Sequence, residues 1–380
     1  MSVTTEPNPV RPRVKPPLIR QACFDDYDQI ARLETTVDLA PWPRERWLHL
    51  WLDNPAYHVI SDWPIGWVLE DHEGRIVGSI GNIPELFHLD GREFLGASLV
   101  GWAVDPRYRA YSLMLVAHQL QHPRVDLQLV TTAGPMPQAV FTRLGWSRPP
   151  VGQWDQMAYW ITNYAGAMGS YIERKMARSV SKSVCTMLCA PLGLADSINA
   201  RNRDFTTDYK FAWCSSFDEK FDRFWNELLE SNSGLFLSSR TKNTMKWHFE
   251  YSLERNDTWI LTACDGSRLV GYAILQRSDR PSVRLTRMML VDFQTLVRDP
   301  ALSSAMFSCA LHRCRRERIH ILGNVGCWIE KAQSLVSTPS KHRALGSWCY
   351  LYKASNPDLN KALQIATSWY PTQYDGDASL

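Results

Sequence analysis

The stretch from Trp102 to Leu120 constrains the fold most strongly, because its hydrophobic pattern changes on either side of one proline, Pro106. The residues before this proline suit a buried strand; they are Leu99, Val100, Ala103 and Val104. Apolar residues then return at helical spacing; they are Leu113, Val116, Ala117 and Leu120. We therefore predict a strand, a tight loop and a helix. Such a loop offers main-chain N–H groups and the positive end of a helix dipole, which together favour a phosphate group.

This arrangement resembles the loop with which the GNAT superfamily of N-acyltransferases binds the pyrophosphate of coenzyme A. In that family a strand ends near Val-x-Pro and is followed by Arg-x-x-Gly-x-Gly/Ala and a helix. The matching positions are Val104, Pro106, Tyr108 and Arg109, while Ser112 and Met114 stand where the family has its two small residues. The resemblance implies a site for acetyl-CoA or another acyl-CoA as substrate. Its expected residues are Ala103, Val104, Arg109, Ala110, Tyr111, Ser112, Leu113 and Met114.

The rest of the first half follows the order of elements that this superfamily has. Acidic residues at Asp25 and Asp26 are expected to cap a helix, and the three tryptophans between 41 and 51 suit either a core or a substrate wall. Asp90-Gly91 predicts a tight turn within a hairpin. The expected elements are a strand at 18–22, a helix from 25, a helix at 41–51, a hairpin at 66–80, a second hairpin at 86–104, a strand at 126–132 and a helix at 134–144.

The second half repeats the plan of the first. The hairpin sequence from Trp67 to Gly78 returns, with one inserted residue, from Trp259 to Gly271. Strands at 284–293, 319–323 and 348–352 and helices at 301–315 and 330–336 follow in the same order. We predict an α/β (α+β) fold of two tandem GNAT-like domains, each with a mixed, mainly antiparallel central sheet flanked by helices. The expected ranges are a disordered leader at 1–17, domains at 18–162 and 206–380, and a linker helix region at 163–205.

Composition indicates which kinds of partner and which cellular compartment to expect. A net charge of only +3 gives no dominant basic field for nucleic acid. The nine cysteines are scattered without metal-ligand spacing, so we expect reduced thiols, no metal site and a cytoplasmic location. The polar, proline-rich start lacks the apolar segment of a signal peptide, and no apolar run reaches the length of a membrane span. The sequence does not indicate an oligomeric state.

Three residues are candidates for catalysis. Acyl transfer needs a base for the amine proton and donors for the tetrahedral oxyanion. Glu85 and Asp292 stand at matching places in the two halves and are the candidate bases; the alternative for each is a solvated or capping carboxylate. In the GNAT family a tyrosine four residues before a helix-ending glycine often protonates the thiolate, and this chain has Phe141 there. Tyr111 is the nearest alternative phenol, unless it is a packing residue of the turn.

The resemblance implies an N-acyltransferase acting on an amine, such as an amino sugar. Tandem domains of this kind resemble those of mycothiol synthases and of acyltransferases in bacterial cell-surface polysaccharide biosynthesis. The segments Arg240–Phe249 and Trp369–Asp377 look like segments found in these polysaccharide acyltransferases. Their residues do not indicate a catalytic mechanism. The alternatives are a Fem-type aminoacyl transferase and a non-catalytic scaffold or ligand-sensing module.

The linker region carries a further expectation. Basic residues around 174–182 could hold the segment 170–200 against an anionic membrane surface, which would make the protein membrane-peripheral. The alternative is a solvated helix between the domains.

Overall fold

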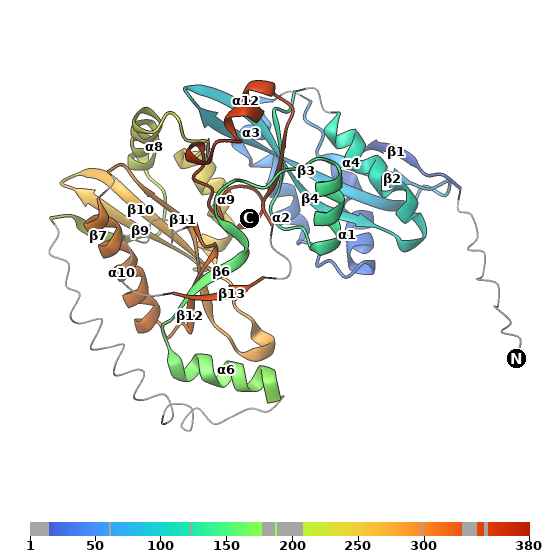
Figure 1. Cartoon of the computed structure of the whole chain (residues 1–380). Helices are drawn as coiled ribbons and strands as arrows, with labels where there is room; N and C mark the ends of the chain where they lie inside the picture. The colour runs from blue at the N-terminus through green and yellow to red at the C-terminus, as the bar shows by residue number, and fades with distance from the viewer. Residues whose placement is uncertain are drawn as a thin grey trace, which may run out of the picture. The chain divides into compact units, whose positions relative to one another are not determined.

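The computed structural model describes residues 15–60, 62–121, 124–176, 187, 208–297, 299–328, 340–345 and 349–380. Within these ranges the strands form two sheets of seven strands each, with helices packed on them (Figure 1). One sheet has the order β1-β2-β3-β4-β5-β14, with β8 paired to β3, and the other has the order β13-β6-β12-β11-β10-β9-β7. The predicted fold class, mixed sheets flanked by helices, is confirmed.

Internal contacts divide the chain into two compact units that are interleaved in the sequence. The first unit contains residues 1–52, 60–83 and 99–124, and the second contains 53–59, 84–98 and 125–380. The long strands β3 (Ile76–Leu89) and β4 (Arg92–Val104) contribute to both. The predicted helix at 330–336, the first 14 residues of the leader, and most of the linker after 176 lie outside the described residues.

The first unit contains the elements predicted around the Pro106 stretch. They are β1 (Leu18–Gln21), η1 (Phe24–Asp26), α1 (Tyr27–Thr36), α2 (Arg44–Leu52), β2 (Gly66–Glu70), η2 (Pro106–Tyr111) and α4 (Ser112–Leu120), with parts of β3 and β4. Trp47 and Trp51 of α2 are buried, and the Trp51 indole N–H donates to Asn82 O at 2.8 Å, so these two rings belong to the core. Asp26 makes no side-chain cap on α1; its carboxylate instead binds the Arg20 guanidinium at 2.7 Å and the main-chain N–H of Cys23 at 2.9 Å.

The second unit carries one sheet entirely and the other in part. Its elements are α3 (Pro55–Val59), β5 (Leu127–Val130), α5 (Pro135–Arg143), β6 (Gln153–Ile161), α6 (Tyr164–Met176), β7 (Lys210–Cys214), α8 (Glu219–Ser231), β8 (Leu237–Ser238), α9 (Lys242–Glu254), β9 (Thr258–Asp265), β10 (Arg268–Arg277), η3 (Pro281–Val283), β11 (Arg287–Thr295), α10 (Pro300–Arg316), β12 (Ile321–Gly326), β13 (Lys341–Ala344), β14 (Leu351–Ala354), α12 (Pro357–Ala362) and η5 (Ala366–Ser368). Among the described residues, no helix combines the length and the apolar character needed to cross a membrane.

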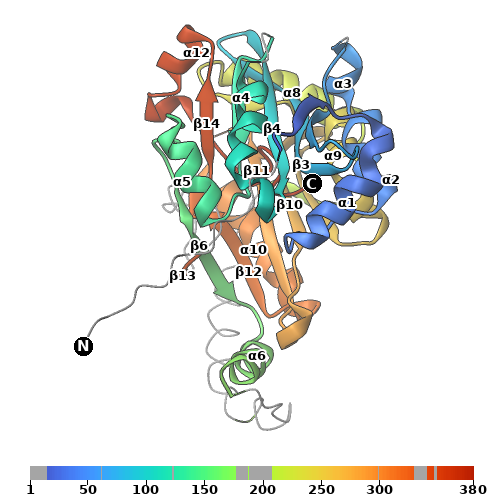
Figure 2. The same cartoon turned by 90° about the vertical axis from the view of Figure 1, so that its right-hand side faces the viewer.

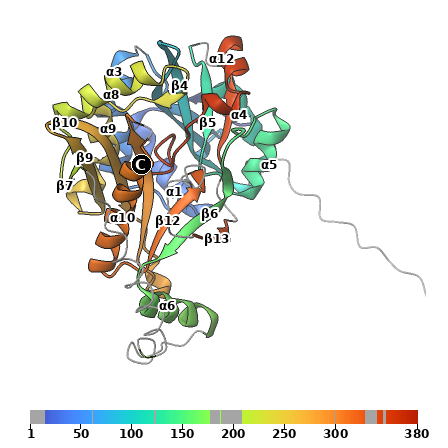
Figure 3. The same ribbon diagram turned by 60° about the vertical axis from the view of Figure 1, so that its left-hand side comes forward.

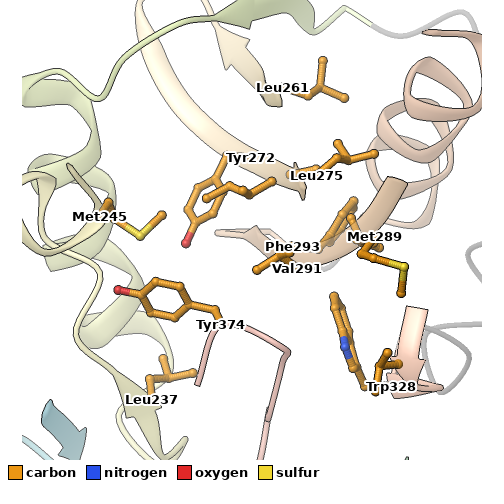
Figure 4. Packing of buried hydrophobic residues seen from close by; sticks show 14 of the residues in the cluster. Leu237, Met245, Leu261, Tyr272, Leu275, Met289, Val291, Phe293, Trp328 and Tyr374 are labelled. Atoms are coloured by element: carbon orange, nitrogen blue, oxygen red, sulfur yellow. The ribbon is translucent and has the colours of Figure 1, made fainter. Parts of the chain in front are cut away.

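Local sequence explains the boundaries of several of these elements. Asp299 caps α10 by accepting the N–H of Ala301 at 2.8 Å, and Pro300 suits the first helical position, where no N–H is needed. Helix α8 buries one face with Phe221, Phe224 and Leu228, at helical spacing. The apolar side chains of α9, β10, β11 and the C-terminal segment, including Met245, form a continuous core (Figure 4).

Strand pairing differs from the predicted order at two places. β6 follows the first-half helix α5 in sequence, but it pairs antiparallel with β12 and β13 in the second sheet (Figure 2). The final strand, predicted at 348–352 as part of the second half, forms at 351–354 and pairs with β5 in the first sheet. Each half of the sequence therefore contributes a strand to the sheet that begins in the other half. Periodicity identifies a strand but does not identify its neighbour, which is why this exchange was not predicted.

Candidate functional site

The predicted coenzyme loop has the expected strand–turn–helix form in the first unit. β4 ends at Val104, and the Asp105 carboxylate accepts the N–H of Arg107 at 2.8 Å, which starts η2 at Pro106. η2 runs directly into α4, and the N–H of Ser112 donates to Arg109 O within this junction. The helix N-terminus is therefore tighter than an open glycine loop, because at least this donor is already used.

The predicted coenzyme residues differ in how accessible they are. Arg109 and Ala110 are exposed and Leu113 is 48% exposed, whereas Ala103 is buried in β4. Tyr111, Ser112 and Met114 are half-buried at the start of α4, and Val104 is half-buried at the end of β4. An exposed guanidinium and a helix start are suitable for a pyrophosphate. Their role in binding stays a prediction.

The same unit holds a carboxyl group that the sequence did not single out. Gly101 lies within β4 in the left-handed region, at φ +58°, which indicates a local departure from regular strand geometry. A Cβ built on Gly101 would lie 2.7 Å from Oε1 of Glu34 in α1, so these two groups are packed closely. Burial raises the pKa of Glu34 to about 7. A glycine inside an apolar strand pattern was the available signal for such a close approach.

A small pocket that is partly open to solvent lies within the second unit. It is formed by α3, β3, β8, α9 and the C-terminal segment. Its lining residues are Asn54, Ala56, Pro84, Glu85, Leu86, Ser238, Ser239, Thr244, Trp247, His248, Tyr374 and Gly376. Most come from the segments 240–249 and 369–377 and from the strand around Glu85, so two segments without an assigned mechanism meet a predicted base.

Glu85 is the buried carboxyl of this pocket and is 9% exposed. Ser98 Oγ donates a hydrogen bond to Glu85 Oε1, and the main-chain N–H of Gly376 donates to Oε2 at 3.3 Å. Burial, opposed by the Ser98 hydrogen bond and reinforced by the negative charge of Asp375, raises the pKa of Glu85 to about 8. The group is therefore mostly protonated at neutral pH and becomes a base just above it.

Asp292 lies on β11 in a different environment and does not line the pocket. Its carboxylate is fully buried and binds the Arg240 guanidinium at 2.8 and 3.2 Å. The hydroxyls of Tyr272 and Thr372 donate to it at 2.7 and 3.1 Å, and the Gln294 amide donates at 3.1 Å. With its oxygens used in this way, the geometry assigns Asp292 to holding Arg240 and does not support its predicted role as a base.

Arg240 connects this carboxylate to the pocket wall. Its guanidinium also lies 3.3 Å from the Asp375 carboxylate, and 4.7 Å from the centre of the Tyr374 ring. The Tyr374 hydroxyl donates to Ser239 O at 2.8 Å. These contacts hold the residues just before Gly376, whose N–H reaches Glu85. Arg240 therefore positions the donor for the candidate base.

Phe141 is a core residue. It is 1% exposed on α5, and its ring centre lies 4.8 Å from that of Trp146. A phenyl ring has no proton to donate, so Phe141 cannot act as an acid. The candidate phenol, Tyr111, lies in the first unit at the junction of η2 and α4.

Comparisons with known proteins bear on the fold. No family model matches the chain, and no curated protein matches its sequence. A GCN5-related N-acetyltransferase from Kribbella flavida is similar in structure with a TM-score of 0.55 at 12% identity, over 89% of this chain and 71% of that one. A GCN5-related N-acetyltransferase from Anabaena variabilis has a TM-score of 0.54 at 11% identity, over 89% and 72%.

A third similar structure is the glucosamine N-acetyltransferase region of a fungal multi-domain β-N-acetylglucosaminidase. It has a TM-score of 0.52 at 12% identity, over 90% of this chain and 38% of that one. At such low identities the likeness extends to the fold and not to the chemistry. The chain thus has the fold of GCN5-related N-acetyltransferases.

Proposed function

We propose that this chain is an N-acyltransferase that moves an acetyl or other acyl group from a coenzyme A thioester to an amine. The observation that carries the proposal is the buried carboxyl of Glu85 in a pocket wall, with a pKa of about 8, on a chain of GNAT fold. A base whose pKa lies near the working pH is suited to removing a proton from an amine and then passing it on.

The proposed reaction is a direct transfer. The lone pair of the neutral amine attacks the thioester carbonyl, whose oxygen takes the negative charge, and the C–S bond then breaks with coenzyme A leaving as a thiolate. The amine proton passes to the Glu85 carboxylate, which returns it to water. Tyr111 is the proposed proton donor to the thiolate, since Phe141 has no proton to donate, and the resulting tyrosinate regains a proton from water. The main-chain N–H groups of Ala103 and Val104 in β4 are the proposed donors to the oxyanion.

Glu85→Gln tests the base. We expect turnover to fall at least 100-fold while coenzyme binding stays unchanged, because the amide cannot accept the proton. Glu93→Gln is the matched control, since Glu93 lies on β4 with an exposed side chain outside the pocket. Turnover of Glu85→Gln at the rate of the native chain would remove Glu85 from the mechanism.

The coenzyme site is proposed at the residues around η2 and α4 named above. Arg109→Ala combined with Ser112→Tyr should weaken coenzyme A binding at least tenfold in calorimetry, through loss of a cation and crowding of the helix start. Arg32→Ala is the control, because Arg32 is also an exposed arginine of the first unit. Undiminished binding of coenzyme A by the double variant would show that the coenzyme site lies elsewhere. No binding of coenzyme A or acetyl-CoA at millimolar concentration would favour a scaffold or sensor over an enzyme.

The acceptor is proposed to be an amino sugar of a surface-polysaccharide pathway. In support, the pocket combines the flat rings of Trp247 and Tyr374 with the hydroxyls of Ser238 and Thr244. This combination suits a ligand with apolar faces and several hydroxyl groups. Amino sugars and aliphatic amines of similar size should be compared as acceptors. Transfer only from aminoacyl-tRNA would instead favour a Fem-type activity.

We also propose that residues 18–162 and 206–380 descend from one duplicated domain, joined by 163–205. In support, β2–β3 and β9–β10 are both antiparallel hairpins with Trp67 and Trp259 in their first strands. Each is followed by a parallel strand pair, β4 with β5 and β11 with β12.

A further inference from the structure

One end of the second sheet carries a concentration of positive charge. We call the side chains of residues 173–175, 277–287 and 341–343 the basic end. It contains eight arginines and lysines against two acidic residues, an excess of six positive charges, although the whole chain carries only +3. Its basic residues are Arg174, Lys175, Arg277, Arg280, Arg284, Arg287, Lys341 and Arg343.

Several elements of the second unit converge here. Ser170 Oγ of α6 donates to Arg284 O at 3.1 Å, and the Arg284 guanidinium binds the Glu173 carboxylate at 3.0 Å. β6 lies between β12 and β13, with Lys341 opposite Tyr159 and Arg343 opposite Met157. Figures 1 and 3 show α6 below this end of the sheet, close to the loop that joins β10 and β11.

The two acids do not neutralise the basic end. Asp279 binds the Arg277 guanidinium at 2.8 Å and the main-chain N–H of Arg287 at 2.9 Å, while Glu173 is engaged by Arg284. Burial, together with the neighbouring charges of Arg280 and Arg343, lowers the pKa of Arg287 to about 10. The pKa of Arg343 is also lowered, first by burial and then by the positive charges of Arg280 and Arg174. Like charges held together in this way would be stabilised by an anionic partner.

Helix α6 adds exposed apolar groups beside these charges. Met168 is 38% exposed and Tyr171 is 58% exposed, three residues apart on the helix. Lys175 follows at the next turn on the same stripe, and Arg174 is beside it, both exposed. A stripe of apolar and aromatic side chains bordered by lysine and arginine is typical of helices that lie in a membrane interface.

We propose that the basic end, together with Met168 and Tyr171 of α6, binds an anionic phospholipid surface. The arginines and lysines contact the lipid phosphates, and the two apolar side chains enter the headgroup region. The charge excess favours anionic over zwitterionic lipid, and the apolar stripe favours a bilayer over a dissolved anion.

Sedimentation of the full chain with vesicles tests this proposal. We expect binding to vesicles of phosphatidylcholine with phosphatidylglycerol, little binding to phosphatidylcholine alone, and weakening by salt. Arg280→Gln with Arg343→Gln should weaken binding at least about tenfold. Met168→Ser with Tyr171→Ser should also weaken it. The control is Lys246→Gln with Lys361→Gln, which removes the same charge from exposed positions on α9 and α12.

Three outcomes would overturn the proposal. Equal binding to both kinds of vesicle would show that the charge of the basic end does not drive the binding. Undiminished binding of the arginine variant, with its fold verified by circular dichroism, would place the contact elsewhere. Loss of binding in the arginine variant without any loss in the Met168/Tyr171 variant, with full competition by inorganic phosphate, would identify a dissolved anion as the ligand instead of a bilayer.

Discussion

At the residue scale, the two candidate bases are separated by their surroundings. Asp292 is surrounded by donors and a guanidinium, which stabilise its charge. Glu85 has one hydroxyl and one main-chain N–H as partners and negative neighbours, which favour its neutral form. The two carboxyl groups thus have opposite electrostatic environments. Glu85, with its pKa raised to about 8, can exchange a proton near neutral pH.

The raised pKa of Glu85 predicts a pH dependence of stability. Between the ordinary value of 4.5 and about 8, the folded chain binds a proton at Glu85 that the unfolded chain releases. The free energy of unfolding therefore falls as the pH rises through this range, by roughly 3–5 kcal/mol for this group. Glu85→Gln should be more stable than the native chain at pH 8.5 and close to it at pH 4.5. Urea unfolding at both values measures this, and a difference that does not change with pH would contradict the raised pKa.

Arg240 gives a second prediction at this scale. Arg240→Met leaves the carboxylates of Asp292 and Asp375 buried without their cation, which should cost about 3–5 kcal/mol at pH 8. The loss should be smaller at pH 5, because burial raises the pKa of Asp375 to about 6 and protonation then neutralises this carboxyl. Arg268→Met is the control, because Arg268 pairs with Glu227 at the exposed surface and should change stability little. Equal effects of the two variants in urea unfolding would contradict the role given to Arg240.

At the element scale, local patterns predicted more than long-range pairing did. The Pro106 stretch, the Asp90-Gly91 turn and the hairpin around Gly266 are each determined by a few neighbouring residues, and all three formed as expected. The exchange of β6 and β14 was missed, because pairing depends on residues far away in the sequence. For the same reason the sequence singled out Glu85 as a candidate, while its contacts with Ser98 and Gly376 could not be predicted.

The close contact between Gly101 of β4 and Glu34 can be tested with a matched pair of glycines. Gly101 and Gly266 both have φ +58°, so alanine is strained at each by about 1 kcal/mol. An added Cβ meets nothing within 4 Å at Gly266, but at Gly101 it would lie 2.7 Å from Glu34 Oε1. Gly101→Ala should therefore destabilise the chain more than Gly266→Ala in thermal unfolding. Glu34→Ala should remove much of this difference in a double-mutant cycle, and a cycle without coupling would contradict the close contact.

At the scale of the whole molecule, the second unit is built from both halves of the sequence. The rings of Phe87 and Phe236 are stacked with centres 4.8 Å apart, and those of Trp160 and Phe307 meet at 4.7 Å. These pairs belong to one continuous hydrophobic cluster. A cut at residue 162 would pass through this core. Descent from two domains, as we propose, is therefore compatible with a present chain whose halves depend on each other.

This dependence predicts how fragments behave. Residues 18–162 alone lack β14 and β8, which pair with β5 and β3, and residues 206–380 alone lack β6, which pairs with both β12 and β13. Each fragment would expose apolar core and unpaired strand edges, so neither should unfold cooperatively in a thermal scan monitored by circular dichroism. Coexpression is the control, because each fragment then supplies the strand that the other lacks, and the pair should copurify and regain a cooperative transition. A fragment 18–162 that unfolds cooperatively by itself would show that the exchanged strands are not required.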